Sequence, residues 1–194
     1  MTNYEEILNC IQSEPAYQAN LEWGKPRSGH PEGSIRQHIM ELEHNLGRLR
    51  PKLSDDEFWK LRVLIHTHDT FKPDASSGVA IVDPNSHASL ARKFLERYVK
   101  DRDLLTIVQF HDEPFALWKK YRYGGDHSER KRQLLEVIDD WDLLLAFLIV
   151  DGCTAGKSTE PLEWFFAEIE HEVESKVDAT WIQIAANHGL GSES

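Results

Sequence analysis

Five ionisable side chains occupy helical positions that the surrounding sequence fills with apolar residues. These side chains are His38, His68, His87, His111 and Asp151. His38, for example, follows Ile35 by three residues and precedes Leu42 by four, and this spacing places it on the same helix face as both. The pattern therefore predicts that imidazole and carboxylate groups from five separate helices point towards one core.

Ionisable groups inside a protein core need a compensating partner. A buried carboxylate without one costs several kcal/mol, and an unsatisfied buried imidazole costs roughly 1–3 kcal/mol. Any one of these residues alone is readily explained as a hydrogen-bonded core histidine or an acid at a helix end. A divalent cation satisfies all of them together, because neutral imidazole nitrogen and carboxylate oxygen are its natural ligands. The set predicts a site for one or two ions, with Mn, Fe, Co, Ni, Mg and Zn as the candidate metals.

A series of helices must position these residues. Ser34 is suited to cap a helix that runs to about residue 49, and Ser54 or Asp55 is suited to begin the helix that ends near His68. Further helices are expected over residues 4–12, 86–99, 101–112, 115–121, 128–151 and 161–177. Because strand-like alternation is nearly absent, the sequence predicts an all-α fold, a compact bundle of about seven helices.

Composition indicates one globular domain over residues 1–194, with its core between about 24 and 178 and a frayed tail from 189. The 194 residues are 40% hydrophobic and 28% charged, and no repeat or linker divides them. The net charge of -11 makes nucleic acid an unlikely partner and disfavours a membrane surface, because both attract positive charge. The two cysteines and an N-terminal segment unlike a signal peptide favour a cytoplasmic location. The oligomeric state stays open.

The order of these residues resembles the H…HD…D signature of the HD superfamily of metal-dependent phosphohydrolases. His38 corresponds to the first histidine, the adjacent His68-Asp69 pair to the HD motif, and Asp151 to the distant last acid. Asp142 is the alternative for that acid, although only Asp151 ends its helix and is followed by small residues.

Two neighbouring stretches extend the resemblance. The residues after the His-Asp pair are similar to the family's HD-x-G-K stretch, with Lys72 retained and Phe71 in place of the usual glycine. The segment Gly29–Ser34 is similar to the entry of the HD domain in tRNA nucleotidyltransferases. The resemblance covers residues 24–156 and implies an HD-type helical bundle.

The resemblance also implies a ligand set and a reaction. The implied metal ligands are His38, His68, Asp69, His87, His111 and Asp151. Asp69 is the ligand that would bridge two ions. The reaction would be hydrolysis of a phosphomonoester or phosphodiester in a small nucleotide or similar phosphorylated metabolite by water that the metal activates. Asp69 and Lys72 are the catalytic candidates, since Lys72 would offset negative charge on the transferring group. Arg27 and Lys25 are further candidates for phosphate contacts.

Two other functions remain open. The same ligand order resembles that of di-iron HD-type oxygenases, which cleave C–C or C–P bonds with dioxygen. The departure at Phe71 is also compatible with a non-catalytic module that binds a nucleotide or a metal and regulates a partner. His66, two residues before His68, is predicted to point to another helix face, either on the surface or in support of the ligands.

Overall fold

The structure is a computed structural model that describes residues 3–28 and 31–186. Within these ranges the regular elements are helices, which confirms the all-α prediction. The α-helices are α1 (Tyr4–Gln12), α2 (Pro15–Asn20), α3 (Ile35–Leu49), α4 (Asp55–Thr67), α5 (His87–Leu95), α6 (Arg102–Phe110), α7 (Glu113–Arg122), α8 (Ser128–Val137), α9 (Trp141–Gly152), α10 (Glu160–Ile169) and α11 (Thr180–Ala186). Two short 3-10 helices are η1 (Arg50–Lys52) and η2 (Lys72–Asp74). The tail expected from residue 189 lies outside the described residues.

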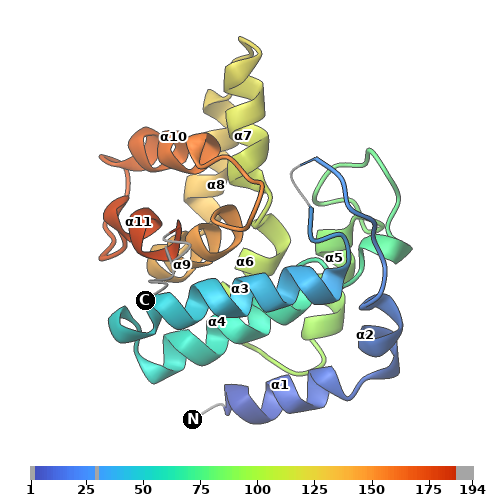
Figure 1. Cartoon of the computed structure of the whole chain (residues 1–194). Coiled ribbons are helices and arrows are strands. Elements are labelled where there is room, and N and C mark those ends of the chain that lie inside the picture. The colour runs from blue at the N-terminus through green and yellow to red at the C-terminus, as the bar shows by residue number, and fades with distance from the viewer. Residues whose placement is uncertain (1–2, 29–30, 187–194) are drawn as a thin grey trace, which may run out of the picture.

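Helices α3 and α4 lie side by side across the molecule, with α1 packed against α4 (Figure 1). Helix α9 contacts both α3 and α4, α6 contacts α4, and α5 packs on α6. Core side chains also come from α1 and α11, outside residues 24–178. The helices that carry or directly precede the five predicted ionisable residues therefore meet around one core.

Local hydrogen bonds explain where the two central helices begin. The Ser34 hydroxyl accepts a hydrogen bond from the backbone N–H of Gln37, and Ser54 forms a reciprocal capping box with Glu57. Both interactions satisfy N–H groups that a helix start leaves without an intrahelical partner. The predicted starts of α3 and α4 are confirmed, and the start of α4 sets the register in which His68 follows its last turn.

Two glycines shape the chain before α3. Gly24 and Gly33 have φ angles of +115° and +81°, in the left-handed region that favours glycine. A Cβ on Gly24 would lie 2.2 Å from the carbonyl oxygen of Gly33, and one on Gly33 would lie 2.7 Å from the Pro26 ring. This close packing holds the segment that leads into α3 and that includes Glu32.

The predicted helix over 128–151 is wrong, because the chain is extended at Ile138 and a new helix starts at Trp141. The Asp140 side chain accepts a hydrogen bond from the N–H of Leu143 and so begins α9. The apolar stripe continues across this break, which is why periodicity alone did not reveal it. The helix expected over 161–177 likewise ends at Ile169. With α2 and α11 also unpredicted, the described helices exceed the expected seven or so.

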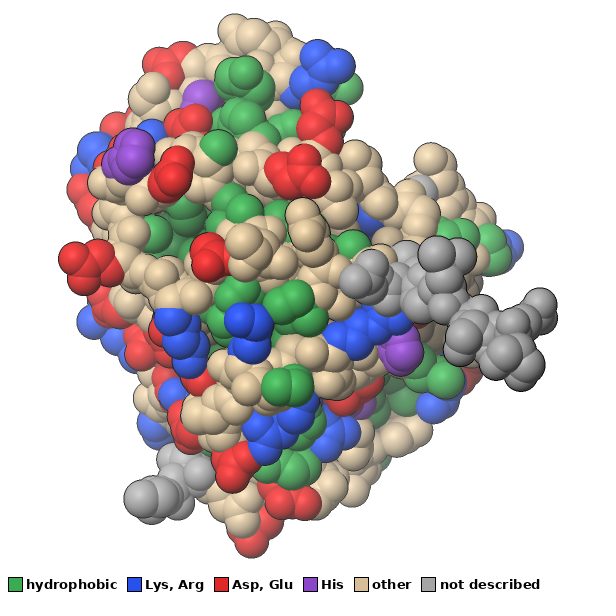
Figure 2. All heavy atoms as spheres, turned by 60° about the vertical axis from the view of Figure 1, so that its left-hand side comes forward, with side chains coloured by type: hydrophobic (Ala, Val, Ile, Leu, Met, Phe, Trp, Pro, Cys, Tyr) green, Lys and Arg blue, Asp and Glu red, His purple; other side chains and the backbone are tan. Residues whose placement is uncertain are grey.

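The surface carries both signs of charge. Figure 2 shows Lys and Arg side chains among acidic and apolar ones on the face that lies to the left in Figure 1. In the described part of the chain, no helix combines the length and the apolar character that crossing a bilayer requires.

Candidate metal centre

The predicted ligands sit at helix ends or within one turn of them. His68 directly follows α4, His87 is the first residue of α5, and His111 directly follows α6. Asp151 lies in the last turn of α9, and His38 is the fourth residue of α3, at the end of its first turn. His38, His68, Asp69 and His111 are buried. The fold therefore brings side chains from five separate helices to one place, as the sequence pattern predicts.

Asp69 lies at the centre of this group. Its Oδ2 atom lies 3.9 Å from Nε2 of His38 and 3.5 Å from Nε2 of His68. Its Oδ1 atom lies 3.8 Å from Nε2 of His87 and 3.7 Å from Nε2 of His111. Ligands bound to zinc at ~2.0–2.2 Å in tetrahedral geometry are separated by ~3.3–3.6 Å, so these spacings are close to those of a formed site.

The two oxygens of Asp69 thus face two different pairs of histidines. One group of possible ligands is His38, His68 and Asp69, and the other is Asp69, His87 and His111, with the ligand atoms in each group lying within 4.8 Å of one another. Either group can hold a metal ion. Because Asp69 belongs to both, it can bridge two ions.

Hydrogen bonds orient the rings of the buried histidines. Nδ1 of His111 donates to the carbonyl of Val108 at 2.8 Å, and Nδ1 of His68 lies 3.1 Å from the carbonyl of Ile65. A carbonyl can only accept, so Nδ1 carries a proton in both rings and Nε2 is the nitrogen directed at Asp69. A metal ligand bound through Nε2 requires this placement of the Nδ1 proton.

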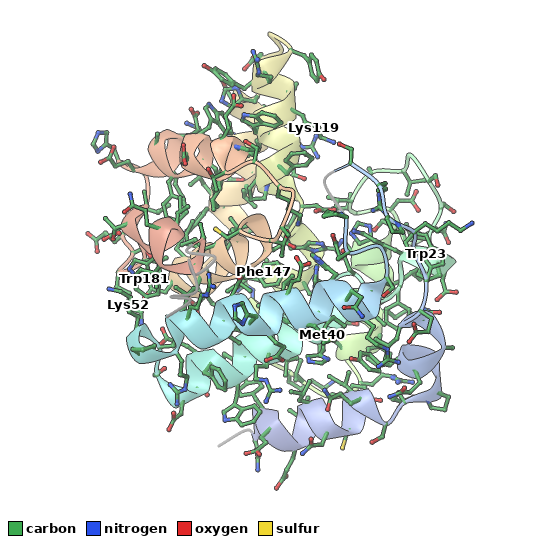
Figure 3. The ribbon with its side chains drawn as sticks, viewed as in Figure 1. Trp23, Met40, Lys52, Lys119, Phe147 and Trp181 are labelled. Carbon is green, nitrogen blue, oxygen red and sulfur yellow. The ribbon has the colours of Figure 1, made fainter. Side chains whose placement is uncertain are left out.

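The Nε2 atom of His68 supplies the observation that favours a metal most directly. It is buried, and among the described atoms it has no hydrogen-bond partner. Phe147 packs edge-on against this ring at 5.1 Å, and it also contacts His111 at 6.1 Å. Figure 3 shows Phe147 in the interior, above α3. An imidazole nitrogen left unsatisfied against a phenyl ring costs roughly 1–3 kcal/mol, which a bound cation removes.

The two histidines of the group formed with Asp69, His38 and His68, differ in pKa. Burial lowers the pKa of His68 to about 3, so this ring is neutral at pH 7. Burial would also lower the pKa of His38, but hydrogen bonds with Asp151 and Glu32 outweigh it and raise that pKa to about 9. A metal ion that binds to His38 therefore displaces a proton, which makes binding at this position dependent on pH.

Two lysines form ion pairs with the two acids of the cluster. Lys72 forms an ion pair with Asp69, and Lys157 lies 2.9 Å from Oδ1 of Asp151. Burial alone would raise the pKa of both acids, but Lys72 holds that of Asp69, and Lys157 that of Asp151, well below the usual range. Both acids are therefore ionised at neutral pH.

The last ligand of the predicted set lies beside His38. Oδ1 of Asp151 is 3.0 Å from Nε2 of His38, although Asp151 is not a member of either compact group. Asp142, the alternative, accepts hydrogen bonds from Ser175 and from the backbone N–H of Lys176. Asp142 is therefore engaged elsewhere on α9, and ligation by Asp151 stays a prediction.

His66 points away from the cluster, as its spacing predicts, but it is not a surface residue. It is buried, with Nδ1 lying 2.6 Å from the Tyr17 hydroxyl and Nε2 lying 3.0 Å from Oε1 of Glu43. The alternative of a surface position is wrong because α1 and α2 cover this face of α4. Residues 29 and 30, which begin the segment that resembles the entry of the HD domain, lie outside the described residues.

Three residues near the cluster were not predicted from the sequence. Oε1 of Glu32 lies 3.3 Å from Nδ1 of His38, Oδ2 of Asp112 lies 3.2 Å from Nε2 of His87, and Lys157 pairs with Asp151. Glu32 and Lys157 precede α3 and follow α9, so helical periodicity gave no signal for them. For Asp112, the one feature of the sequence that indicates a place near the cluster is its position directly after His111, in a second His-Asp pair.

A cavity of about 610 Å³, called here the first cavity, opens onto the cluster. His68, Asp69, His111 and Asp151 line it together with Lys72 and Lys157. Lys25 and Arg27 are exposed, and the residue from their loop that lines the cavity is Ser28. Phosphate contacts by Lys25 and Arg27 stay a prediction.

Comparisons of the chain with protein-family models, with curated proteins and with solved structures found no match.

Proposed function

We propose that this chain is a metal-dependent phosphohydrolase of the HD type that acts on a small phosphorylated metabolite or nucleotide. The observation that carries the proposal is Asp69, whose two carboxylate oxygens each face a separate pair of imidazole nitrogens. An acid shared between two histidine pairs is suited to bridge two cations. A divalent ion held there supplies an activated water and withdraws charge from a phosphoryl oxygen.

The donor set narrows the choice of metal. Imidazole nitrogens outnumber carboxylates in the two compact groups, and such a set suits Mn, Fe, Co, Ni or Zn better than Mg, which prefers oxygen ligands. We therefore infer a transition metal as the resident ion.

Two lysines of the first cavity, Lys72 and Lys157, would bind the phosphoryl group of the substrate. Lys72 and Lys157 each form an ion pair with an acid of the cluster and also line the cavity, where their ammonium groups would face a bound phosphoryl group. Both would attract an anionic substrate and stabilise the charge that develops on its oxygens. The apolar side chains of Phe165 and Leu162 also line the cavity and would exclude water from the bound substrate.

The test is metal content and turnover of two matched variants. Asp69→Asn removes the shared charge with almost no change of volume, whereas Asp142→Asn makes the same change on α9 away from the cluster. We expect purified Asp69→Asn to lose at least one metal equivalent by elemental analysis and to lose phosphoester hydrolysis at least 100-fold. Asp142→Asn should match the unaltered protein in both measurements.

The same preparations separate the alternatives. Oxygen consumption by the iron-loaded protein together with absence of phosphate release would favour the oxygenase chemistry. Retained metal without turnover of any phosphoester or any consumption of oxygen would favour a regulatory module. Metal content that is equal in Asp69→Asn and the unaltered protein would refute the proposed site.

A further inference from the structure

A second cavity lies next to the first. Its volume is about 1120 Å³, and its walls come from the loop over residues 75–82, from α7 and from α8. Trp23 and Lys119, both labelled in Figure 3, line it from two different segments, the chain before α3 and helix α7. Protein cavities that bind small ligands have volumes of roughly 300–1,000 Å³, so each of the two cavities can take a separate chemical group.

The cluster of possible metal ligands lies at the boundary between these two cavities. Four residues line both of them: Lys72, Asp112, Phe115 and Lys119. The possible ligands are divided, because His68, Asp69 and His111 line the first cavity whereas His87 lines the second. A group bound at Asp69 and His87 is therefore accessible from both sides.

The shared wall contains two lysines, one aromatic ring and the acid Asp112. Phe115 is 47% exposed and stacks on Trp118 with ring centroids 5.5 Å apart, and Lys119 lies over the Phe115 ring at 4.9 Å. The second cavity is also lined by the apolar side chains of Val79 and Val82, which are 38% and 60% exposed. Such walls suit planar or apolar substituents, and the lysines suit an anion between them.

We propose that the substrate is a phosphodiester whose reacting phosphate lies at the cluster and whose two substituents occupy the two cavities. The inference rests on the proposed phosphohydrolase function. In the reaction a water oxygen bonds to phosphorus, the bond from phosphorus to one ester oxygen breaks, and that oxygen takes a proton and leaves as an alcohol. The other product is a phosphomonoester. A monoester substrate would fill one cavity and leave the second without a role.

The test compares a diester with its matched monoester on metal-loaded full-length protein. The probes are bis(p-nitrophenyl) phosphate and p-nitrophenyl phosphate, which carry the same substituent twice and once. We expect kcat/KM to be at least tenfold higher for the diester. A value for the monoester that is equal or higher, with clear turnover, would overturn the inference and leave the proposed function intact. Absence of turnover of both probes would instead refute the proposed function.

Two substitutions on different walls test the second cavity itself. Ala116 on α7 lines this cavity and not the first, so Ala116→Trp fills it from one side. Val82→Asp changes the facing loop at an exposed position, where folding tolerates substitution. We expect the ratio of kcat/KM for the diester to that for the monoester to fall at least tenfold in Ala116→Trp and at least threefold in Val82→Asp.

Tyr123→Trp is the control. Tyr123 is 86% exposed at the end of α7 and lines neither cavity, so the ratio should stay as in the unaltered protein. If the ratio is unchanged in Val82→Asp and in Ala116→Trp, the second cavity does not hold a substituent and the inference is wrong.

Discussion

Glu32 holds the imidazole of His38 from the side opposite Asp69. Its Oε1 atom lies 3.3 Å from Nδ1 of His38, while Nε2 of the same ring lies near Asp69 and Asp151. A carboxylate behind a ligating histidine fixes the tautomer and the direction of the ring, and it increases the basicity of the nitrogen that binds the metal.

Glu32→Ala should therefore weaken metal binding by about 10–100-fold, because losses of this size follow when such a supporting group is removed. The measurement is a competition titration of Mn²⁺ against a chelator. The control is Glu22→Ala, which removes an exposed acid of the same region that pairs with Arg36. Equal Mn²⁺ affinity in Glu32→Ala and Glu22→Ala would show that Glu32 does not support the ligand.

The histidines of the cluster could be predicted because each interrupts an apolar face. His38 and His68 are ionisable residues at positions where apolar residues recur every three or four positions. Such an exception can be recognised within one segment of the sequence. Glu32 gave no such signal, because the segment before α3 is not a helix and has no faces. Its contact with His38 depends on the packing of Gly24 against Gly33.

At the scale of elements, Asp101 joins three helices. It caps α6 by accepting hydrogen bonds from the N–H groups of Asp103 and Leu104. Its Oδ2 atom accepts a hydrogen bond from the Tyr4 hydroxyl of α1, and it lies 3.1 Å from the ammonium group of Lys60 in α4. Burial would raise the pKa of Asp101, but the bonds from Tyr4, Leu104 and Lys60 together lower it.

Asp101→Asn should lower the free energy of unfolding by about 1–2 kcal/mol at pH 7, because Asn retains the cap but loses the charge-assisted bonds. An acid with a lowered folded-state pKa stabilises the protein above its unfolded pKa of about 3.9, and this stabilisation is lost as pH falls through the folded pKa. The difference between the two proteins should therefore shrink below about pH 4. Urea unfolding at pH 7 and at several values down to pH 3 measures it. A constant difference over this range would contradict the argument.

Helix boundaries were less predictable than helix faces. The sequence showed one apolar stripe from Leu134 through Leu148, which in the structure belongs to α8 and α9 in turn. A break that keeps its apolar side chains in the same core leaves the stripe intact. The residue that indicates this break is Asp140, whose side chain accepts a hydrogen bond from the N–H of Leu143 and so caps a new helix.

At the scale of the whole molecule, the cluster brings together ionisable side chains from five helices. A metal ion that binds the folded protein and not the unfolded chain stabilises the folded state by about 2.7 kcal/mol at a free concentration 100-fold above its Kd. For a chain of this size we expect Mn²⁺ at that concentration to raise Tm by roughly 5–10 °C over chelator-treated protein.

Differential scanning calorimetry at constant pH measures this shift. Asp69→Asn is the matched protein, because its loss of the shared charge should abolish most of the increase in Tm. A Tm that rises equally in both proteins would place the stabilising ion elsewhere on the acidic surface.

The sequence by itself determined the fold class, the caps of α3 and α4, and the types of residue that gather in the core. These properties are local, since hydrophobic periodicity and capping depend on residues a few positions apart. Tertiary structure alone decided that Asp69 turns one oxygen to His38 and His68 and the other to His87 and His111. It also decided that two cavities meet at this point. The positions of atoms on separate helices depend on how the helices pack, and no single segment of the chain encodes that packing.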